Sequence, residues 1–101
     1  MAFYIVAPAG VVSGGPELAH QLCASILEKG YTAKMYYVYK DCDDPIDIEA
    51  EDKFKKYNTS HVTLLEEADK CENIVIVPEG LTNWVYVFKN AKKSYLVDEC
   101  G

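Results

Sequence analysis

Residues 3–30 (FYIVAPAGVVSGGPELAHQLCASILEKG) decide the fold class. They open with a continuous apolar run over 3–7, which is typical of a strand buried on both faces. A Gly-rich loop over 8–15 follows, and Pro16 suits the first position of a helix. Beyond Pro16, apolar residues recur in one helical stripe: Leu18, Ala19, Leu22, Cys23, Ile26 and Leu27. Gly30 is suited to end that helix. The stretch predicts a β-loop-α unit.

The remaining chain continues the alternation. Residues 32–39 (TAKMYYVY) and 73–78 (NIVIVP) predict two more strands. Acidic residues crowd 41–52, which predicts a long surface excursion with a helical turn near 52–57. The sequence Thr63-Leu64-Leu65-Glu66 predicts a capping box that opens a short helix.

Residues 81–93 give conflicting signals. The run 84–88 (WVYVF) prefers strand locally. Two parallel strands, however, need a crossover of about a dozen residues, and 95–97 (YLV) resembles the next strand. Lys89, Lys92 and Lys93 also suit a helix C-terminus. We therefore expect a helix over 81–93.

Strands that alternate with helices predict an α/β fold. We expect one Rossmann-like domain over 1–101, a three-layer sandwich in which a parallel sheet of about four strands carries helices on both faces. This is half of the usual doubly wound sheet. An uncovered edge or face of it would need a neighbour, so we expect either part of a larger protein or a homodimer.

Composition excludes several classes of function. The chain of 101 residues has 16 acidic residues, 10 lysines and no arginine, and a net charge of −6. Nucleic acids and anionic membranes require cationic surface, so neither is an expected partner. No apolar run approaches the ~20 residues of a transmembrane helix, and residues 1–6 lack the features of a signal peptide. We expect a soluble, cytoplasmic protein.

Four cysteines stand at 23, 42, 71 and 100, with no C-x-x-C pair. This spacing indicates neither a zinc site nor a redox motif. We expect no metal and free thiols, with Cys23 and Cys71 in the core.

Ligands of parallel α/β sheets bind beyond the carboxyl ends of the strands. That rule selects the loop 10–15, Asp41, residues 78–80 and residues 98–99. In the loop, Gly14 and Gly15 allow backbone to approach a ligand, and the helix start favours an anion. The loop matches neither standard nucleotide fingerprint, and a tight turn alone is the alternative explanation.

Each candidate side chain has a structural alternative. Glu17 either faces the cleft or stabilises the helix dipole. His20 lies at the margin of the apolar stripe, where a structural role competes with a place on the cleft rim. Asp41 and Glu79 either bind hydroxyl groups or belong to solvated turns, and Asp98 is a site acid or part of a frayed terminus. The candidate ligand-binding residues are Ser13, Gly14, Gly15 and Glu17, with His20, Glu79 and Asp98 at the rim. No catalytic constellation is visible.

The chain resembles the amino-terminal end of bacterial glycosyltransferases with the two-domain GT-B architecture, of the capsular and cell-surface polysaccharide type. The resemblance is carried by Pro8 with residues 14–22 (GGPELAHQL), then, in the same order, by residues 31–33, 44–46, 56–58 and 73–79. It covers most of this chain but only about the first quarter of such an enzyme.

This resemblance implies the acceptor-side domain of an enzyme that transfers a sugar from a nucleotide-sugar to a saccharide or lipid-linked acceptor. In such enzymes the Gly-rich loop, here 13–15, points at the cleft near the donor diphosphate. The second domain grips the nucleotide-sugar, and no cofactor or metal is needed. Residues matching the donor-binding Arg, Lys and Glu are absent here, so we expect the isolated chain to be inactive.

Two alternatives remain beside a truncated enzyme domain. One is a stand-alone module that binds a nucleotide or sugar phosphate on the Gly-rich loop. The other is a non-catalytic interaction domain that uses an uncovered sheet or helix face. A reading frame that continues past Gly101 into a second α/β domain would favour the enzyme.

Overall fold

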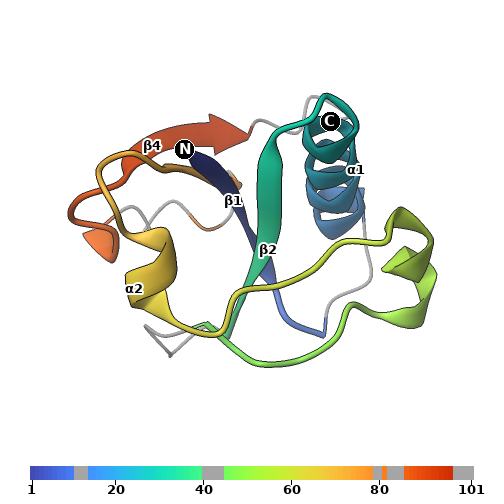
Figure 1. Ribbon diagram of the computed structural model, residues 1–101. Helices are drawn as coiled ribbons and strands as arrows, with labels where there is room; N and C mark the ends of the chain where they lie inside the picture. The colour runs from blue at the N-terminus through green and yellow to red at the C-terminus, as the bar shows by residue number, and fades with distance from the viewer. Residues whose placement is uncertain (11–13, 40–44, 79–80, 82–85, 97–101) are drawn as a thin grey trace.

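The computed structural model describes residues 1–10, 14–39, 45–78, 81 and 86–96. Its strands form one all-parallel sheet in the order β2-β1-β3-β4 (Figure 1). Their bounds are β1 (Ala2–Pro8), β2 (Thr32–Val38), β3 (Ile74–Pro78) and β4 (Lys92–Leu96). The expected α/β, Rossmann-like fold with a parallel sheet of four strands is confirmed.

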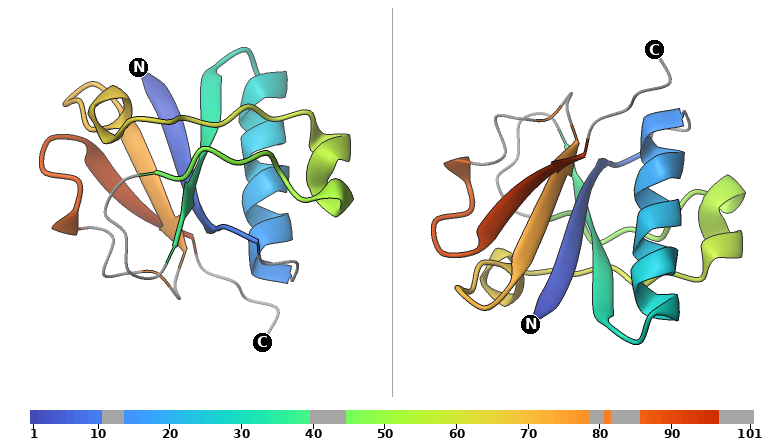
Figure 2. Two further views of the ribbon diagram at one scale, coloured as in Figure 1. Left: turned by 90° about the horizontal axis from the view of Figure 1, so that it is seen from below. Right: turned by 90° about the horizontal axis from the view of Figure 1, so that it is seen from above.

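Helical elements lie on both sides of this sheet (Figure 2). They are α1 (Gly14–Glu28), the 3₁₀-helix η1 (Asp52–Tyr57) and α2 (Leu65–Ala68). The long helix α1 packs on β1 and β2, and η1 lies beside α1. The short helix α2 covers the opposite face together with Phe88 and Ala91.

The central strand β1 explains why both faces must be covered. Ile5 and Ala7 pack in the core under α1, whereas Tyr4 and Val6 pack in the core under α2. Successive side chains of a strand point to opposite faces, so a strand buried on both faces reads as a continuous apolar run. The predicted strand over 3–7 is thereby confirmed, and its position between β2 and β3 accounts for its composition.

The outer edge of β2 is covered by residues 45–64, the described part of the excursion between β2 and α2. The Met35 amide donates a hydrogen bond to the Ser60 carbonyl at 2.8 Å, and the Val62 amide donates to the Met35 carbonyl at 3.0 Å. Farther along β2, the Ile46 amide donates to the Tyr37 carbonyl at 2.8 Å. The excursion is thus part of the sheet's border, with β4 as the other border.

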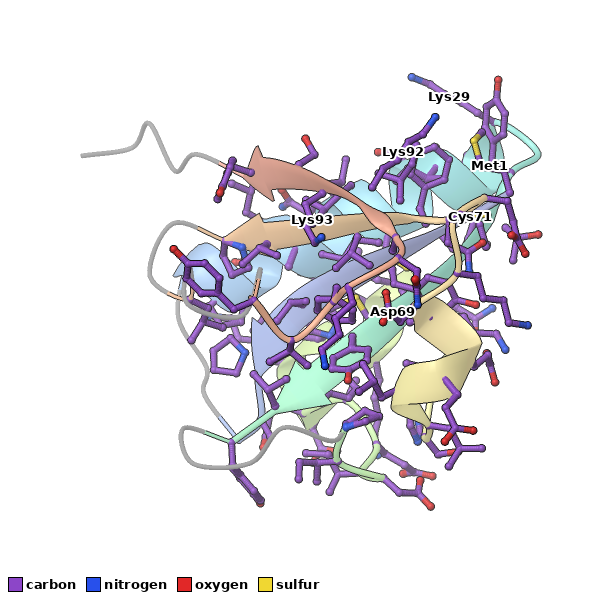
Figure 3. All side chains as sticks on the ribbon, turned by 90° about the vertical axis from the view of Figure 1, so that its left-hand side faces the viewer. Met1, Lys29, Asp69, Cys71, Lys92 and Lys93 are labelled. Carbon is purple, nitrogen blue, oxygen red and sulfur yellow. The ribbon has the colours of Figure 1, made fainter. Side chains whose placement is uncertain are left out.

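The expected helix over 81–93 is wrong over 87–93. Tyr86 still lies in a 3₁₀ turn, residues 87–91 run through a turn and bends, and β4 already begins at Lys92. The cause is Asp69, just after α2, whose carboxylate accepts hydrogen bonds from the amides of 89, 90 and 91 at 3.0, 2.7 and 2.9 Å. Figure 3 shows Asp69 between α2 and the start of β4. Amides bound in this way cannot form the i to i−4 ladder of a helix.

Asn73, which is buried, completes the junction that Asp69 forms between the end of α2 and the start of β4. Its Nδ2 donates to the carbonyls of Glu67 and Ala68 at 3.2 Å each, which satisfies the C-terminal end of α2. Its Oδ1 accepts from the Ala2 amide at 3.1 Å, and its carbonyl accepts from the Lys92 amide at 3.0 Å. Asn73 therefore joins α2 to the start of β1 through its side chain and binds the start of β4 through its backbone carbonyl.

Two smaller expectations are also wrong. The capping box at Thr63 does not form: α2 begins at Leu65, and Leu64 at its N-cap makes no side-chain hydrogen bond. Cys71 is exposed in the turn before β3, because the junction built by Asp69 and Asn73 places that turn at the surface. Cys23 is buried as expected. None of the helices in the described part of the chain has the length and apolar character that crossing a bilayer requires.

Replacing Asp69 by Asn tests the junction. We expect Asp69→Asn to lower the free energy of unfolding by about 2 kcal/mol at pH 7, since charge-assisted hydrogen bonds become neutral ones and one of the two accepting carboxylate oxygens is replaced by an NH2 group. Asp52→Asn, at an aspartate whose side chain is 95% exposed, is the matched control and should change stability by less than about 0.5 kcal/mol. Urea unfolding measures both, and equal effects would contradict the role of Asp69.

The same variant tests a pH dependence. Partial burial acts to raise the pKa of Asp69, but hydrogen bonds from the amides of 91, 90 and 89 outweigh it and hold the pKa below its usual value. A lowered folded-state pKa contributes stability above the unfolded pKa of about 3.9, and that stability is lost as pH falls through the folded pKa. The stability gap between wild type and Asp69→Asn should therefore narrow below about pH 4.

Candidate functional site

A hollow of about 250 Å³ opens where β1 and β3 end, beside the start of α1. Its described wall consists of Val6, Ala7, Pro8, Gly15, Pro16, Ala19, Pro78 and Leu81. The chain leaves β1 toward β2 on one side, whereas β3 lies on the other. Such a switch point is where open α/β sheets bind their ligands. We call this hollow the β1–β3 pocket.

Gly15 lies in the first turn of α1, and its backbone conformation and surroundings do not require a glycine. Its φ is not positive, and a Cβ built on it would meet no atom within 4 Å. Gly10 and Gly30 differ, because their φ values of +73° and +89° disfavour any other residue. Glycine within a helix costs up to about 1 kcal/mol relative to alanine. The open space over Gly15 is therefore available to a ligand.

The described wall of the pocket carries no cationic side chain. The chain has no arginine, and only Lys40 among its 10 lysines lies outside the described residues. None of the described lysines lines the pocket. Pro8, Pro16 and Pro78 also lack a backbone N–H. This wall favours apolar groups.

Glu17 faces η1 and does not line the pocket. Its Oε2 accepts a hydrogen bond from the Tyr57 hydroxyl at 3.0 Å and lies 3.6 Å from the Lys56 ammonium. The hydrogen bond from Tyr57, assisted by Lys53 and Lys56, lowers the pKa of Glu17. Glu17 thus ties the first turn of α1 to the excursion.

His20 lies in the core between α1, β2 and η1. Its Nδ1 is 2.7 Å from the Pro16 carbonyl, which only accepts, so Nδ1 carries the proton. Its Nε2 then accepts a hydrogen bond from the Tyr37 hydroxyl at 2.8 Å. The ring stacks on Phe54 with centroids 4.6 Å apart. Burial lowers the pKa of His20 and raises that of Tyr37 to about 12. This geometry agrees with the structural alternative for His20.

Several predicted site residues fall outside the described part of the chain. These are Ser13, Asp41, Glu79 and Asp98. Gly14 begins α1, so the helix starts two residues before Pro16. Of the described candidate ligand-binding residues, Gly15 lines the pocket, Gly14 precedes it in α1, and Glu17 in the same first turn faces η1. Within the described ranges, no three His, Cys, Asp or Glu side chains cluster in a way that would hold a metal.

Sequence reasoning did not find most of the pocket wall. The sequence pattern places Ala19 in the helical stripe and Leu81 in an expected helix, and it marks neither as a pocket residue. A usable signal was present, since Pro8 and Pro78 each follow a buried apolar run and end a strand. Three of the chain's four prolines meet at this pocket.

A second hollow of about 400 Å³ lies beside η1, lined by Glu49, Ala50, Lys55, Asn58, Thr59 and His61. Its charges already have partners. Lys55 lies 3.7 Å from Glu49, and His61 Nε2 lies 2.8 Å from an Asp47 oxygen. It is built from the excursion and lacks the strand ends that mark ligand sites in this fold.

Comparison with protein-family models, with curated proteins and with solved structures gave no match for this chain.

The freedom at Gly15 gives a paired prediction. We expect Gly15→Ala to raise the free energy of unfolding by about 0.4–1 kcal/mol, because alanine has less backbone freedom when unfolded and meets no clash. Gly30→Ala, at φ +89°, should lower it by about 1–2 kcal/mol. Thermal unfolding of both variants checks this, and destabilisation by Gly15→Ala would show that the fold itself needs glycine there.

His20 predicts a loss of stability in mild acid. Its folded-state pKa is lowered by burial, so its neutral form contributes stability above the unfolded pKa of about 6.5. That contribution is lost as pH falls below this value. Urea unfolding from pH 7.5 to 5.5 should show the loss in wild type and in His61→Gln, the only other histidine. It should be absent in His20→Gln, and a similar pH dependence in that variant would contradict the assignment.

Proposed function

We propose that this chain is the acceptor-side, amino-terminal domain of a GT-B-type glycosyltransferase. The enzyme would move a sugar from a nucleotide-sugar to a saccharide or lipid-linked acceptor of a surface polysaccharide. The supporting observation is the β1–β3 pocket, which lies at the switch point of the sheet with open space over Gly15. The ordered resemblance in the sequence supports the specific family.

The proposal includes that the isolated chain does not catalyse transfer. A leaving diphosphate must be stabilised by cations, helix dipoles or donors placed where its charge develops. The pocket's described wall offers no cationic side chain, and three of its residues lack a backbone donor. Donor binding and leaving-group stabilisation are therefore assigned to a second domain across the cleft.

The same wall argues against a stand-alone module for nucleotides or sugar phosphates. Such a module needs Lys or Arg beside the phosphate, or several free amides in a nest. The interaction-domain alternative has its own observation, since β4 is a border strand whose Lys92, Lys93 and Tyr95 are exposed. Figure 3 shows Lys92 and Lys93 on this border. Paired lysines disfavour edge-to-edge strand addition, so this alternative ranks below the enzyme domain.

Calorimetry and NMR separate these functions. We expect no heat from UDP, GDP or their sugar nucleotides at micromolar concentrations of the chain, because the described wall has no cationic side chain. We expect saccharides such as methyl β-glucoside to shift amide signals of residues near the pocket at millimolar concentration. Micromolar binding of UDP or GDP would favour the stand-alone module. A stable dimer without response to either ligand class would favour the interaction domain.

A further inference from the structure

We propose that the β1–β3 pocket binds an uncharged, apolar, ring-sized group of the acceptor, the part attached to its sugar, and that phosphate groups bind elsewhere. The inference rests on the proposed function for the identity of the whole molecule. The chemistry assigned to the pocket rests only on its wall.

The size of the pocket limits the group. An apolar protein cavity of about 150 Å³ holds a benzene ring. The β1–β3 pocket measures about 250 Å³, which accommodates one six-membered ring with its link to the rest of a ligand. It is smaller than the 300–1,000 Å³ typical of sites that enclose a drug-sized molecule. The pocket is therefore a subsite for one group of a larger ligand.

The described wall disfavours charged and hydroxyl-rich groups. Its side chains are those of Val6, Ala7, Ala19, Leu81 and three prolines, and none of these described side chains carries a hydrogen-bonding atom. Moving a hydroxyl from water to such a surface without a partner costs about 1–3 kcal/mol, and moving a charged phosphate costs far more. A hydrocarbon ring loses nothing there and gains from the burial of apolar surface.

The strand ends and Gly15 give the pocket a firm shape. Pro8 and Pro16 hold fixed φ angles on its two sides, and Ala19 is almost fully buried beneath it. Since no side chain projects from Gly15, the ring can lie against backbone at that point. Rigid walls lower the entropic cost of holding a ligand group.

The test compares three neutral probes and one anion on the 15N- and 13C-labelled full chain. Phenyl β-glucoside carries the sugar and a ring, methyl β-glucoside the sugar alone, and benzyl alcohol the ring alone; inorganic phosphate is the anion. Because Pro8, Pro16 and Pro78 have no amide, the reporters are the amides of Val6, Ala7, Gly15 and Ala19 and the methyl groups of Val6, Ala7, Ala19 and Leu81.

We expect phenyl β-glucoside to bind at least about tenfold more tightly than methyl β-glucoside, as burial of one ring implies. We expect benzyl alcohol to shift the same reporters, and phosphate to leave them unchanged. Gly15→Leu should abolish the advantage of the phenyl group by filling the open space, whereas Ser25→Leu, on an exposed position of α1, should retain it. If Gly15→Leu does not fold, Gly15→Ala should still reduce the phenyl advantage.

Equal affinities of the two glucosides would overturn the proposal, as would reporters that respond to phosphate in preference to benzyl alcohol. Failure of the proposed function has a different signature. In that case benzyl alcohol still binds in the pocket, but adding the sugar in phenyl β-glucoside does not improve affinity and methyl β-glucoside shifts no signal anywhere.

Discussion

The fold depends on the burial of β1 on both of its faces. Ile5 and Val6 are each completely buried, and they point into different cores. A strand of this kind has to be paired on both edges and covered above and below, because its backbone groups need partners and its side chains need apolar contacts. β2 and β3 supply the pairing, and α1 and α2 supply the two covers. The β1–β3 pocket lies at the end of β1, between the end of β3 and the first turns of α1.

The layer that covers the sheet on the α2 side is held in place by polar side chains more than by helical hydrogen bonds. α2 has only four residues, too few to be stable without tertiary contacts. Asp69 and Asn73 flank its C-terminal end and bind backbone groups of 89–92, of α2 itself and of Ala2. These hydrogen bonds allow Phe88 and Ala91 to fill the core under α2, where Phe88 packs edge-on against Tyr36 at 5.1 Å. The crossover from β3 to β4 thus reaches its place without a long helix in its described part.

Local sequence patterns predicted the elements whose signals are local. The apolar run over 3–7, the stripe from Leu18 to Leu27 and the stop at Gly30 identified β1 and α1 within a residue or two. The helix predicted over 81–93 failed over 87–93 because the acceptor for the amides of 89–91, Asp69, lies some 20 residues earlier in the chain. The strand order and the burial of His20 beneath Phe54 also depend on contacts distant in sequence. For the candidate site, the rule that ligands bind at the carboxyl ends of the strands located the pocket. The apolar character of its wall could not be predicted, because it arises from three prolines that come together only in the folded chain.

The two borders of the sheet are not equivalent. Along β2, the backbone groups of Met35 and Tyr37 are already engaged by the excursion, whereas β4 ends the hydrogen-bonded series. Among the described strands, β4 is therefore the border on which a further β-segment would meet no part of the excursion, and there it would have to pass the exposed Lys92 and Lys93. A partner of that kind would lie far from the excursion and from the contacts of His20.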